Sequence, residues 1–557
     1  MRRTGIIADN ALYHCYLKAI GLTFAVMSVV YLFYFEQFIF GNHDWPFMRY
    51  GMSLGIGVWE ARITQFLPPW LFLKGQILPI LGALLAFLYM SVAAVLLAYW
   101  FDLPHRIMPI MLFTLLIVLN PYHLAGFYYN LQTISLGCWH LLTVSGVFLI
   151  WRFLYQRKIL LLLGGVVCLL VALCGYSPIV EMILTLMLVK FLLDVVTLPV
   201  LDKQFVIKWI KFITIIFLVG CIYLGIIDSL KQLKIISEGM YNTQLRSIDD
   251  IFVYWLKNWA QPFYVLASGI PYMKVKLGGC LFLLFICTII ASFIYNRQRF
   301  WFVLALLFII IYSMFFVAYI AEYNVFYVYR VHVFSVAYFS AFLFALVCAL
   351  SKGKGFFGYN IVCLLSVMLL LSEIKADIFA QKVWYLGNKQ DAYAVERIKE
   401  RVLSDVAAHK HYRFFPIGEL YGRAKFAHYD ADYHSFYPSY YSWEYDTAPY
   451  FINNFSSSAF FLYEPENPIW GDSFYAENIL HVVTNENIAL KDKIAAELFA
   501  QNFGNDRTEL AYQFDKLKAF PASPFYIVGK KDIILILSKD EKNQLMLRNL
   551  LRRGLNE

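Results

Sequence analysis

The sequence predicts an α-helical membrane protein of about eleven spans, followed by a C-terminal α/β domain on the outer side of the membrane. Two observations support this fold class. Hydrophobic residues occupy 60% of the 557 positions and charged residues only 15%, whereas soluble domains carry about 25% charged residues. The apolar residues are also gathered into long stretches that end near residue 372, after which the charge density rises.

The predicted spans follow from the roughly 17–25 apolar residues that a helix needs to cross the hydrocarbon core. They cover residues 19–37, 77–100, 107–120, 131–150, 159–175, 178–197, 209–227, 277–295, 300–320, 331–350 and 356–372. The first is long and lacks a small-residue cleavage site, so we expect a retained anchor rather than a cleaved signal peptide. The spans define a membrane domain, residues 1–375, and a second domain, residues 376–557.

The basic residues of the short loops predict the orientation. Every second loop carries Lys or Arg, and the positive-inside bias places such loops in the cytoplasm. These residues are Arg2, Arg3, Arg106, Arg152, Arg157, Lys158, Lys203, Lys208, Lys211, Arg297, Arg299, Lys352 and Lys354. An odd number of spans that starts inside leaves the second domain outside, which in a bacterium is the periplasmic side of the inner (plasma) membrane. The net charge of +9 is then mostly a topology signal, and we expect no nucleic-acid partner.

Several kinds of site are disfavoured by the sequence. All nine cysteines lie in or beside predicted spans and form no CxxC pair, so neither a disulfide scaffold nor a thiolate zinc site is expected. The sequence has no GxxxxGK[ST] motif, and no GxGxxG motif after a strand, that would predict a nucleotide site. It also has no internal repeat, which weakens the hypothesis of an inverted-repeat transporter.

The first outer loop holds the densest set of polar residues, and charges beside apolar spans indicate a functional site by default. Asp44 is the predicted catalytic residue, because a carboxylate beside low-dielectric surroundings can accept a proton from a sugar hydroxyl. Asp44 can also cap a short interfacial helix with Pro46 in its first turn, and the two roles are compatible. His43 is a candidate substrate contact, although a lone interfacial His is more often structural.

The same loop carries two arginines and a glutamate. Arg49 and Arg62 are predicted to bind a lipid phosphate, which the planar guanidinium fork suits better than an ammonium group. The alternative is that both side chains extend to lipid head groups, as Arg near span ends usually does. Glu60 is either the partner of a neighbouring Arg or a second carboxylate of the site, and the sequence leaves both interpretations open.

Four more candidate substrate-binding residues fall on the same predicted side of the membrane. They are His123, Glu181, Glu322 and Arg330. Glu181 and Arg330 lie at or within the membrane boundary, where a charge needs a partner, and Arg330 is a candidate phosphate ligand. Nearby Tyr residues are ambiguous because aromatic belts form at both interfaces whatever the function. The loop 228–276 is expected to contain interfacial helical pieces, which either gate the access of a lipid or simply lie on the membrane surface.

The second domain shows both helix and strand patterns. Residues 389–408 place apolar side chains on one helical face, and residues 412–417 have the pattern of a strand. Two apolar runs, 525–528 and 533–537, flank a turn and predict a hairpin. The aromatic segment 434–450 either stacks on the sugars of an acceptor glycan or packs against the membrane domain.

The layout resembles the serotype-converting glucosyltransferases of the Gtr type, within the broader GT-C class of lipid-sugar-dependent glycosyltransferases. In that family a span is followed by an outer loop with an acidic pair, a nearby Arg and a Gly-Arg element, and His43-Asp44, Arg49 and Ala61-Arg62 occupy these places here. The sequence departs from the pattern at His43, where the family has Asp, and at Ala61, where it has Gly. The first departure puts a paired-acid or metal-bridging role in doubt. The similarity runs from the first loop through the later spans and, more loosely, the second domain.

The resemblance implies transfer of a hexose, with glucose as the first expectation, from a polyprenyl-phosphate donor to a cell-surface glycan such as the O-antigen of lipopolysaccharide. Asp44 would deprotonate the acceptor hydroxyl, while Arg49, Arg62 or Arg330 stabilises the departing phosphate. We expect no cofactor, with a divalent metal left open; the expected partners are the donor, the glycan and membrane lipid. Two alternatives stay open, namely a flippase or transporter of lipid-linked sugars, and a GT-C enzyme that acts on lipid A, teichoic acid or a protein.

Overall fold

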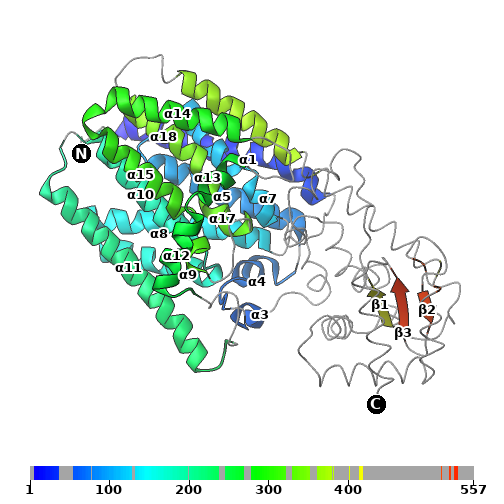
Figure 1. The fold of residues 1–557 in the computed structure, drawn as a ribbon. Coiled ribbons are helices and arrows are strands. Elements are labelled where there is room, and N and C mark those ends of the chain that lie inside the picture. Colours follow the sequence, from blue (N-terminus) through cyan, green and yellow to red (C-terminus); the bar gives the residue numbers. More distant parts are fainter. Residues whose placement is uncertain are drawn as a thin grey trace. The chain divides into compact units, whose positions relative to one another are not determined.

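The chain divides into two compact units, shown as a ribbon in Figure 1. In this computed structural model the first unit is described at residues 6–36, 54–59, 61–76, 78–127, 132–198, 200–236, 245–268, 277–321, 329–351, 360–378 and 381. The second unit is described at residues 401, 413–417, 516, 518, 526–528 and 532–536. The structural statements below concern these residues.

The described part of the first unit is helical. Its elements are α1 (Ile6–Glu36), α3 (Leu54–Trp59), α4 (Leu67–Leu73), α5 (Pro79–Trp100), α6 (Ile107–Val118), α7 (Tyr122–Phe127), α8 (Thr133–Gln156), α9 (Ile159–Gly175), α10 (Ile179–Thr197), α11 (Lys203–Gln232), α12 (Ile248–Asn258), α13 (Gln261–Ser268), α14 (Leu277–Tyr295), the 3-10 turn η4 (Arg297–Arg299), α15 (Phe300–Ser313), α16 (Phe316–Ile320), α17 (Tyr329–Val336) and α18 (Phe339–Leu350). A further helix covers residues 360–378. The helix α8 packs on α5, α9, α10 and α11, while α11 runs along one edge of the unit (Figure 1).

Five helices in the described part of the chain are long and apolar enough to cross a membrane. They contain the spans Tyr13–Phe33, Pro79–Trp100, Thr133–Gln156, Lys203–Gln232 and Val331–Leu350. A sixth is present if Gly279–Tyr295 and Arg297–Ser313, which meet at a bend of 113°, count as one span. The chain is therefore a helical membrane protein, and the total of eleven spans stays a prediction.

In the described residues each predicted span overlaps a helix, but several differ from the prediction in length or continuity. The helices α6 and α9 are shorter than the five long ones. The stretch 331–350 is interrupted by a turn between α17 and α18. The helix α11 extends beyond the predicted stretch 209–227 at both ends. Hydropathy could not locate the two ends of α11, because the polar residues that flank its apolar stretch also favour helix and extend it beyond that stretch.

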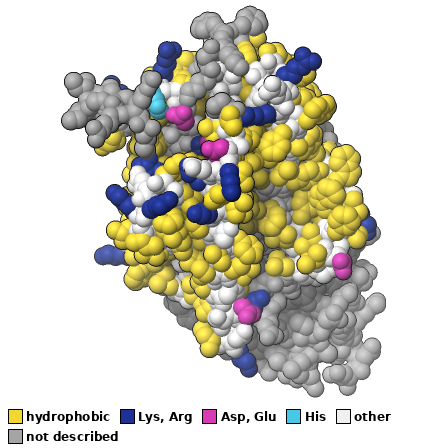
Figure 2. Space-filling model, turned by 90° about the vertical axis from the view of Figure 1, so that its left-hand side faces the viewer, with side chains coloured by type: hydrophobic (Ala, Val, Ile, Leu, Met, Phe, Trp, Pro, Cys, Tyr) yellow, Lys and Arg dark blue, Asp and Glu magenta, His cyan; other side chains and the backbone are white. Residues whose placement is uncertain are grey.

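The surface of the first unit carries many apolar side chains. Figure 2 shows hydrophobic residues over much of one face, with Lys and Arg in smaller groups. Along α11 the exposed large residues include Ile210, Phe217 and Leu224. A soluble protein rarely exposes so large an apolar area, so this surface is expected to contact lipid.

Glycines allow the central helices to approach closely, which is the usual basis of helix packing in membranes. A Cβ atom added to Gly137 of α8 would lie 2.5 Å from Cα and 2.7 Å from the carbonyl oxygen of Ala86 in α5. Gly146 of α8 and Gly165 of α9 are in similarly tight contact, since a Cβ on Gly165 would lie 2.9 Å from the Gly146 oxygen.

The Gly137→Ala substitution is expected to destabilise the protein by about 1–3 kcal/mol, because the new methyl group overlaps backbone atoms that cannot move without displacing α5. The measurement is unfolding of the purified protein in mixed micelles. Gly220→Ala in α11 is the matched control, since its Cβ would meet nothing within 4 Å. This control is expected to be neutral or to gain about 0.5–1 kcal/mol from helix propensity. Equal effects of the two substitutions would contradict the close approach.

The described part of the second unit contains a three-stranded sheet in the order β1-β3-β2. The strands are β1 (Arg413–Ile417), β2 (Tyr526–Val528) and β3 (Asp532–Ile536). Antiparallel pairing of β2 with β3 confirms the predicted hairpin, and β1 confirms the predicted first strand. The parallel pairing of β1 with β3 requires a long connection, as in α/β domains. The predicted helix 389–408 and the aromatic segment 434–450 lie outside the described residues, apart from Arg401.

Candidate functional site at the loop end of the membrane unit

Several connecting segments of the first unit meet at one end of the bundle. The backbone N–H of Thr64 donates to the Cys174 carbonyl (3.1 Å), and Ser135 Oγ donates to the Gln65 carbonyl (2.7 Å). Leu245 pairs with Ala321 in an isolated β-bridge. We call this region the loop end, defined by residues 61–67, 119–123, 174–178, 245–247 and 317–321. These contacts bring together segments from the predicted outer loops, whereas the side of the membrane and the compartment that they face stay predictions.

Arg62 lies at the loop end on a stack of aromatic rings. Its guanidinium carbon is 5.5 Å from the centroid of the Tyr176 ring. Tyr176 in turn stacks on Trp139 of α8, with centroids 5.5 Å apart and an interplanar angle of 7°. Arg62 is half-buried. A planar guanidinium held on an aromatic face presents its N–H edge in a fixed direction, and this geometry suits recognition of a phosphate group.

The turn before Arg62 fixes its position. Ala61 has φ 59°, in the left-handed region that favours glycine, and its side chain packs in a small cluster with Ile227 and Ile236. The Arg62 backbone N–H donates to the Gly57 carbonyl (2.7 Å). A Cβ on Gly57 would lie 2.6 Å from the Arg62 carbonyl oxygen, so the chain can close this turn only with glycine at position 57.

Glu181, in the first turn of α10, is fully buried. His332 Nδ1 of α17 lies 3.0 Å from its Oε2 atom, and the backbone N–H of Val317 donates to Oε1 at 2.9 Å. Ser335 Oγ donates to Oε2 at 3.1 Å. Glu181 thus has a partner, His332, as expected for an acid at the membrane boundary. Both of its carboxylate oxygens accept hydrogen bonds from groups inside the protein. A contact between Glu181 and a substrate stays a prediction.

Arg330 lies on α17, two residues before His332. The contacts of Glu181 therefore hold the helix that carries Arg330. The position of α17 beside α10 and α7 is set by packing. The side chain of Arg330 lies outside the described part, as do His43, Asp44, Arg49, Glu60 and Glu322, and their predicted roles stay predictions.

His123, on α7, is fully buried. Its Nε2 atom lies 2.9 Å from the Ile117 carbonyl, and its ring meets His140 of α8 edge to face at 5.2 Å. His140 Nδ1 is 2.6 Å from the Tyr338 hydroxyl. His123 therefore lies in a buried polar group with His140 and Tyr338. The sequence had pointed to His123 but not to His140 or Tyr338. A spacing pattern cannot reveal a contact between residues that are 198 positions apart, as His140 and Tyr338 are.

The segment 245–268 forms the helical pieces that the sequence predicted, α12 and α13, with Pro262 in the first turn of α13. Arg246 holds this segment to α16: its guanidinium donates to the carbonyls of Ala318 and Tyr319 at 3.1 and 3.0 Å. The guanidinium also lies 3.6 Å from the centroid of the Tyr254 ring. Burial raises the pKa of Tyr254 above its ordinary value, and Arg246 partly offsets this.

The apolar face of α12 points away from the protein. Ile248 is 86% exposed and Phe252 60% exposed, while Asp249 and Asp250 occupy the opposite side of the first turn. Such a face on an amphipathic helix suits the membrane interface, and the interfacial position of α12 stays a prediction. The loop end therefore includes a surface suited to contact with lipid.

The described residues contain no group of three or more His, Cys, Asp or Glu side chains arranged to hold a metal ion. Besides Arg246, sequence analysis missed Asn120, Glu373 and Asp377, which are buried at the same end of the bundle. Glu373 and Asp377 lie four residues apart at the end of an apolar helix, and this spacing was the feature of the sequence that could have indicated a buried pair.

No family model, curated protein or solved structure matches the chain.

Proposed function

We propose that this protein is a membrane glycosyltransferase that moves a hexose, with glucose as the first expectation, from a polyprenyl-phosphate donor to a surface glycan such as O-antigen. The reaction takes place at the loop end, on the outer side of a bacterial inner membrane, with the N-terminus in the cytoplasm and the second domain in the periplasm. Lipid A, teichoic acid and protein are the other acceptor classes compatible with this chemistry.

The observation that carries the proposal is the position of Arg62. A lipid-linked donor presents its phosphate at the membrane boundary, where we expect the loop end to lie, and Arg62 is held at the loop end on the Tyr176–Trp139 stack. The partial exposure of Arg62 gives a ligand access, while the low-dielectric surroundings strengthen its attraction for an anion. The exposed apolar face of α12 at the same end supports a substrate that arrives from the lipid phase.

In the proposed reaction the acceptor hydroxyl oxygen attacks the anomeric carbon, and the bond from that carbon to the phosphate oxygen breaks. Asp44 takes the hydroxyl proton. Arg62, together with Arg49 or Arg330, stabilises the charge that develops on the leaving phosphate. The polyprenyl phosphate leaves with the electron pair of the broken bond, so the step needs no nucleotide.

Arg62→Ala is expected to lower the rate of transfer about 10- to 100-fold, or about 1.4–2.7 kcal/mol of transition-state stabilisation. The assay follows radiolabelled hexose from polyprenyl-phosphate glucose to a glycan extract, with the protein in lipid vesicles. Arg152→Ala is the matched control, because Arg152 also lies over an aromatic ring, that of Phe148 (5.9 Å), but on the last turns of α8. The control is expected to retain activity. Equal transfer by Arg62→Ala and wild type would remove the basis of the proposal.

A flippase of lipid-linked sugars is the second candidate. It is favoured by the acidic side chains buried inside the bundle, since intramembrane charges often mark translocation pathways. The same vesicles distinguish the two functions. A transferase moves label to the glycan, whereas a flippase changes the leaflet in which the labelled lipid is accessible and leaves the label on the lipid.

A further inference from the structure

The helix over 360–378 carries two buried acids one turn apart. Glu373 is 1% exposed and Asp377 is fully buried. Glu181 and Asp194, by contrast, each contact a basic side chain: His332 Nδ1 lies 3.0 Å from the buried Glu181, and Lys190 Nζ lies 2.7 Å from the partly buried Asp194. In the described part of the chain no Lys, Arg or His forms an ion pair with either Glu373 or Asp377.

Each of the two carboxyl groups receives one hydrogen bond from a neutral donor. The Tyr31 hydroxyl of α1 donates to Asp377 Oδ2 at 2.8 Å, and Asn120 Nδ2 donates to Glu373 Oε1 at 3.1 Å. The orientation of the Asn120 amide is fixed, because its oxygen accepts the Tyr122 backbone N–H at 3.1 Å. The remaining oxygens, Glu373 Oε2 and Asp377 Oδ1, are buried and have no hydrogen-bond partner among the described residues.

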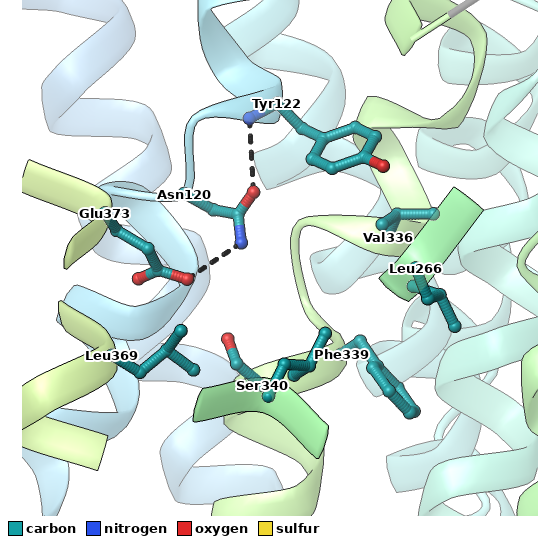
Figure 3. A pocket seen from close by; sticks show the side chains of 9 residues that line it. Asn120, Tyr122, Leu266, Val336, Phe339, Ser340, Leu369 and Glu373 are labelled. Atoms are coloured by element: carbon teal, nitrogen blue, oxygen red, sulfur yellow. Dashed lines mark hydrogen bonds between the residues drawn. The ribbon is translucent and has the colours of Figure 1, made fainter. Parts of the chain in front are cut away.

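Glu373 also lines a cavity of about 30 Å³. In Figure 3 the Glu373 carboxylate, the Asn120 amide and the Ser340 hydroxyl face one another on one side, and apolar side chains such as Leu266 and Phe339 line the other. A buried water needs roughly 10–15 Å³ of such space and two or more polar partners. The polar side of the cavity therefore has room for ordered water next to Glu373.

The neighbouring groups cannot compensate two negative charges. Among the described residues, the side chains beside the acids are Tyr31 from α1, Asn120 from the α6–α7 connection and Ser340 from α18, all of them uncharged. A buried carboxylate without a cation is costly, and a second one beside it adds repulsion. The Asn120 amide presents N–H groups to the cavity, which suits a water molecule or a carboxyl oxygen and disfavours a metal cation.

We propose that Glu373 and Asp377 form a proton-binding site, a carboxyl–carboxylate pair that retains a proton at neutral pH between its two otherwise unpartnered oxygens. One proton converts one of these oxygens into a donor and leaves the other as an acceptor, so the pair no longer presents two buried acceptors without a donor. Loss of the proton leaves two adjacent charges and weakens the contact of helix 360–378 with α1 and Asn120. The site is independent of the proposed glycosyl transfer.

The pH dependence of unfolding tests the site. The folded protein holds a proton that the unfolded chain releases near its ordinary carboxyl range, so stability falls as pH rises, by up to about 1.4 kcal/mol per pH unit. Between about pH 6 and about pH 9 we expect the wild type to lose stability and Glu373→Gln to lose markedly less. The Gln amide replaces the protonated carboxyl as a donor, so at the lower pH this variant should stay within about 1 kcal/mol of wild type.

Asp194→Asn is the matched control, because Asp194 already has Lys190 as its cation, and it should keep the wild-type pH dependence. An infrared spectrum adds a readout that does not depend on the folding of single variants. The carbonyl stretch of a protonated carboxyl group should be present in wild type at neutral pH and decrease at alkaline pH. Absence of this band in the wild type would overturn the proposal. So would a stability that does not depend on pH but increases in sodium chloride and not in choline chloride, because the site would then bind a sodium ion rather than a proton.

Discussion

Replacing Glu181 by alanine is expected to lower the free energy of unfolding by about 3–5 kcal/mol, because several buried polar groups lose their shared partner at once. The carboxylate is fully buried and accepts hydrogen bonds from three donors on α16 and α17. Alanine would remove the acceptor that His332 Nδ1 and the Val317 N–H contact in the folded protein. The Glu181 carboxylate connects α10 to α16 and to α17. Its loss should therefore also weaken the packing of α17 against α10.

Unfolding by increasing SDS fraction in mixed micelles, followed by tryptophan fluorescence, measures this effect. Glu181→Gln keeps an acceptor for the Val317 N–H and should cost less, about 1–3 kcal/mol. Asp194→Ala is the matched control on the same helix. Its partner Lys190 is one turn away at 2.7 Å, and the two side chains keep 11% and 14% of their surface exposed, so Asp194→Ala should cost less than the loss of the fully buried Glu181 contacts.

A double-mutant cycle with His332→Ala separates the pair from its surroundings. If the two single substitutions prove additive, Glu181 and His332 do not interact, and the buried contact at 3.0 Å is not formed in the protein. A coupling of more than about 1 kcal/mol is the expected result.

The positions of the helices along the chain were largely predictable from the sequence, because a bilayer imposes long apolar segments that a local window detects. In the described residues every predicted span overlaps a helix. Helix ends were less predictable: α11 continues to Gln232, five residues past the predicted end at 227. α10 carries three charges that a hydropathy test penalises, yet each has a partner inside the bundle.

The partners within the site were not predictable. Local patterns identified Glu181 as a charge that needs a partner, but the chain gives no sign that this partner is His332, 151 positions away. The same holds for Asn120 with Glu373, 253 positions apart, and for Tyr31 with Asp377, 346 apart. Such pairs depend on how the helices pack, which composition and spacing do not encode.

One local detail of the first loop became interpretable only with the structure. Ala61 stands where the resembling family has glycine, and it adopts a left-handed φ of 59°. The conformation that favours glycine is therefore retained with alanine. Burial of its methyl group against Ile227 and Ile236 offsets part of the conformational cost, which is about 1 kcal/mol for a non-glycine residue in this region.

Asp44→Asn is expected to lower the rate of glycosyl transfer about 10²- to 10⁴-fold, the usual contribution of a general base. The substitution separates the two roles that the sequence leaves open for Asp44. Asparagine caps a helix about as well as aspartate, so a capping role survives the change. An amide cannot accept the acceptor hydroxyl proton at neutral pH, so a catalytic role does not.

The assay is transfer of radiolabelled hexose from the lipid donor by protein in vesicles, with donor binding measured in parallel. Asp249→Asn is the matched control, since Asp249 is an exposed acid in the first turn of α12 on the same predicted side of the membrane. Loss of transfer with retained donor binding in Asp44→Asn alone assigns the proton transfer to Asp44. Full transfer by a folded Asp44→Asn protein would mean that another group takes the proton, and Asp44 would then be a helix cap without a role in the reaction.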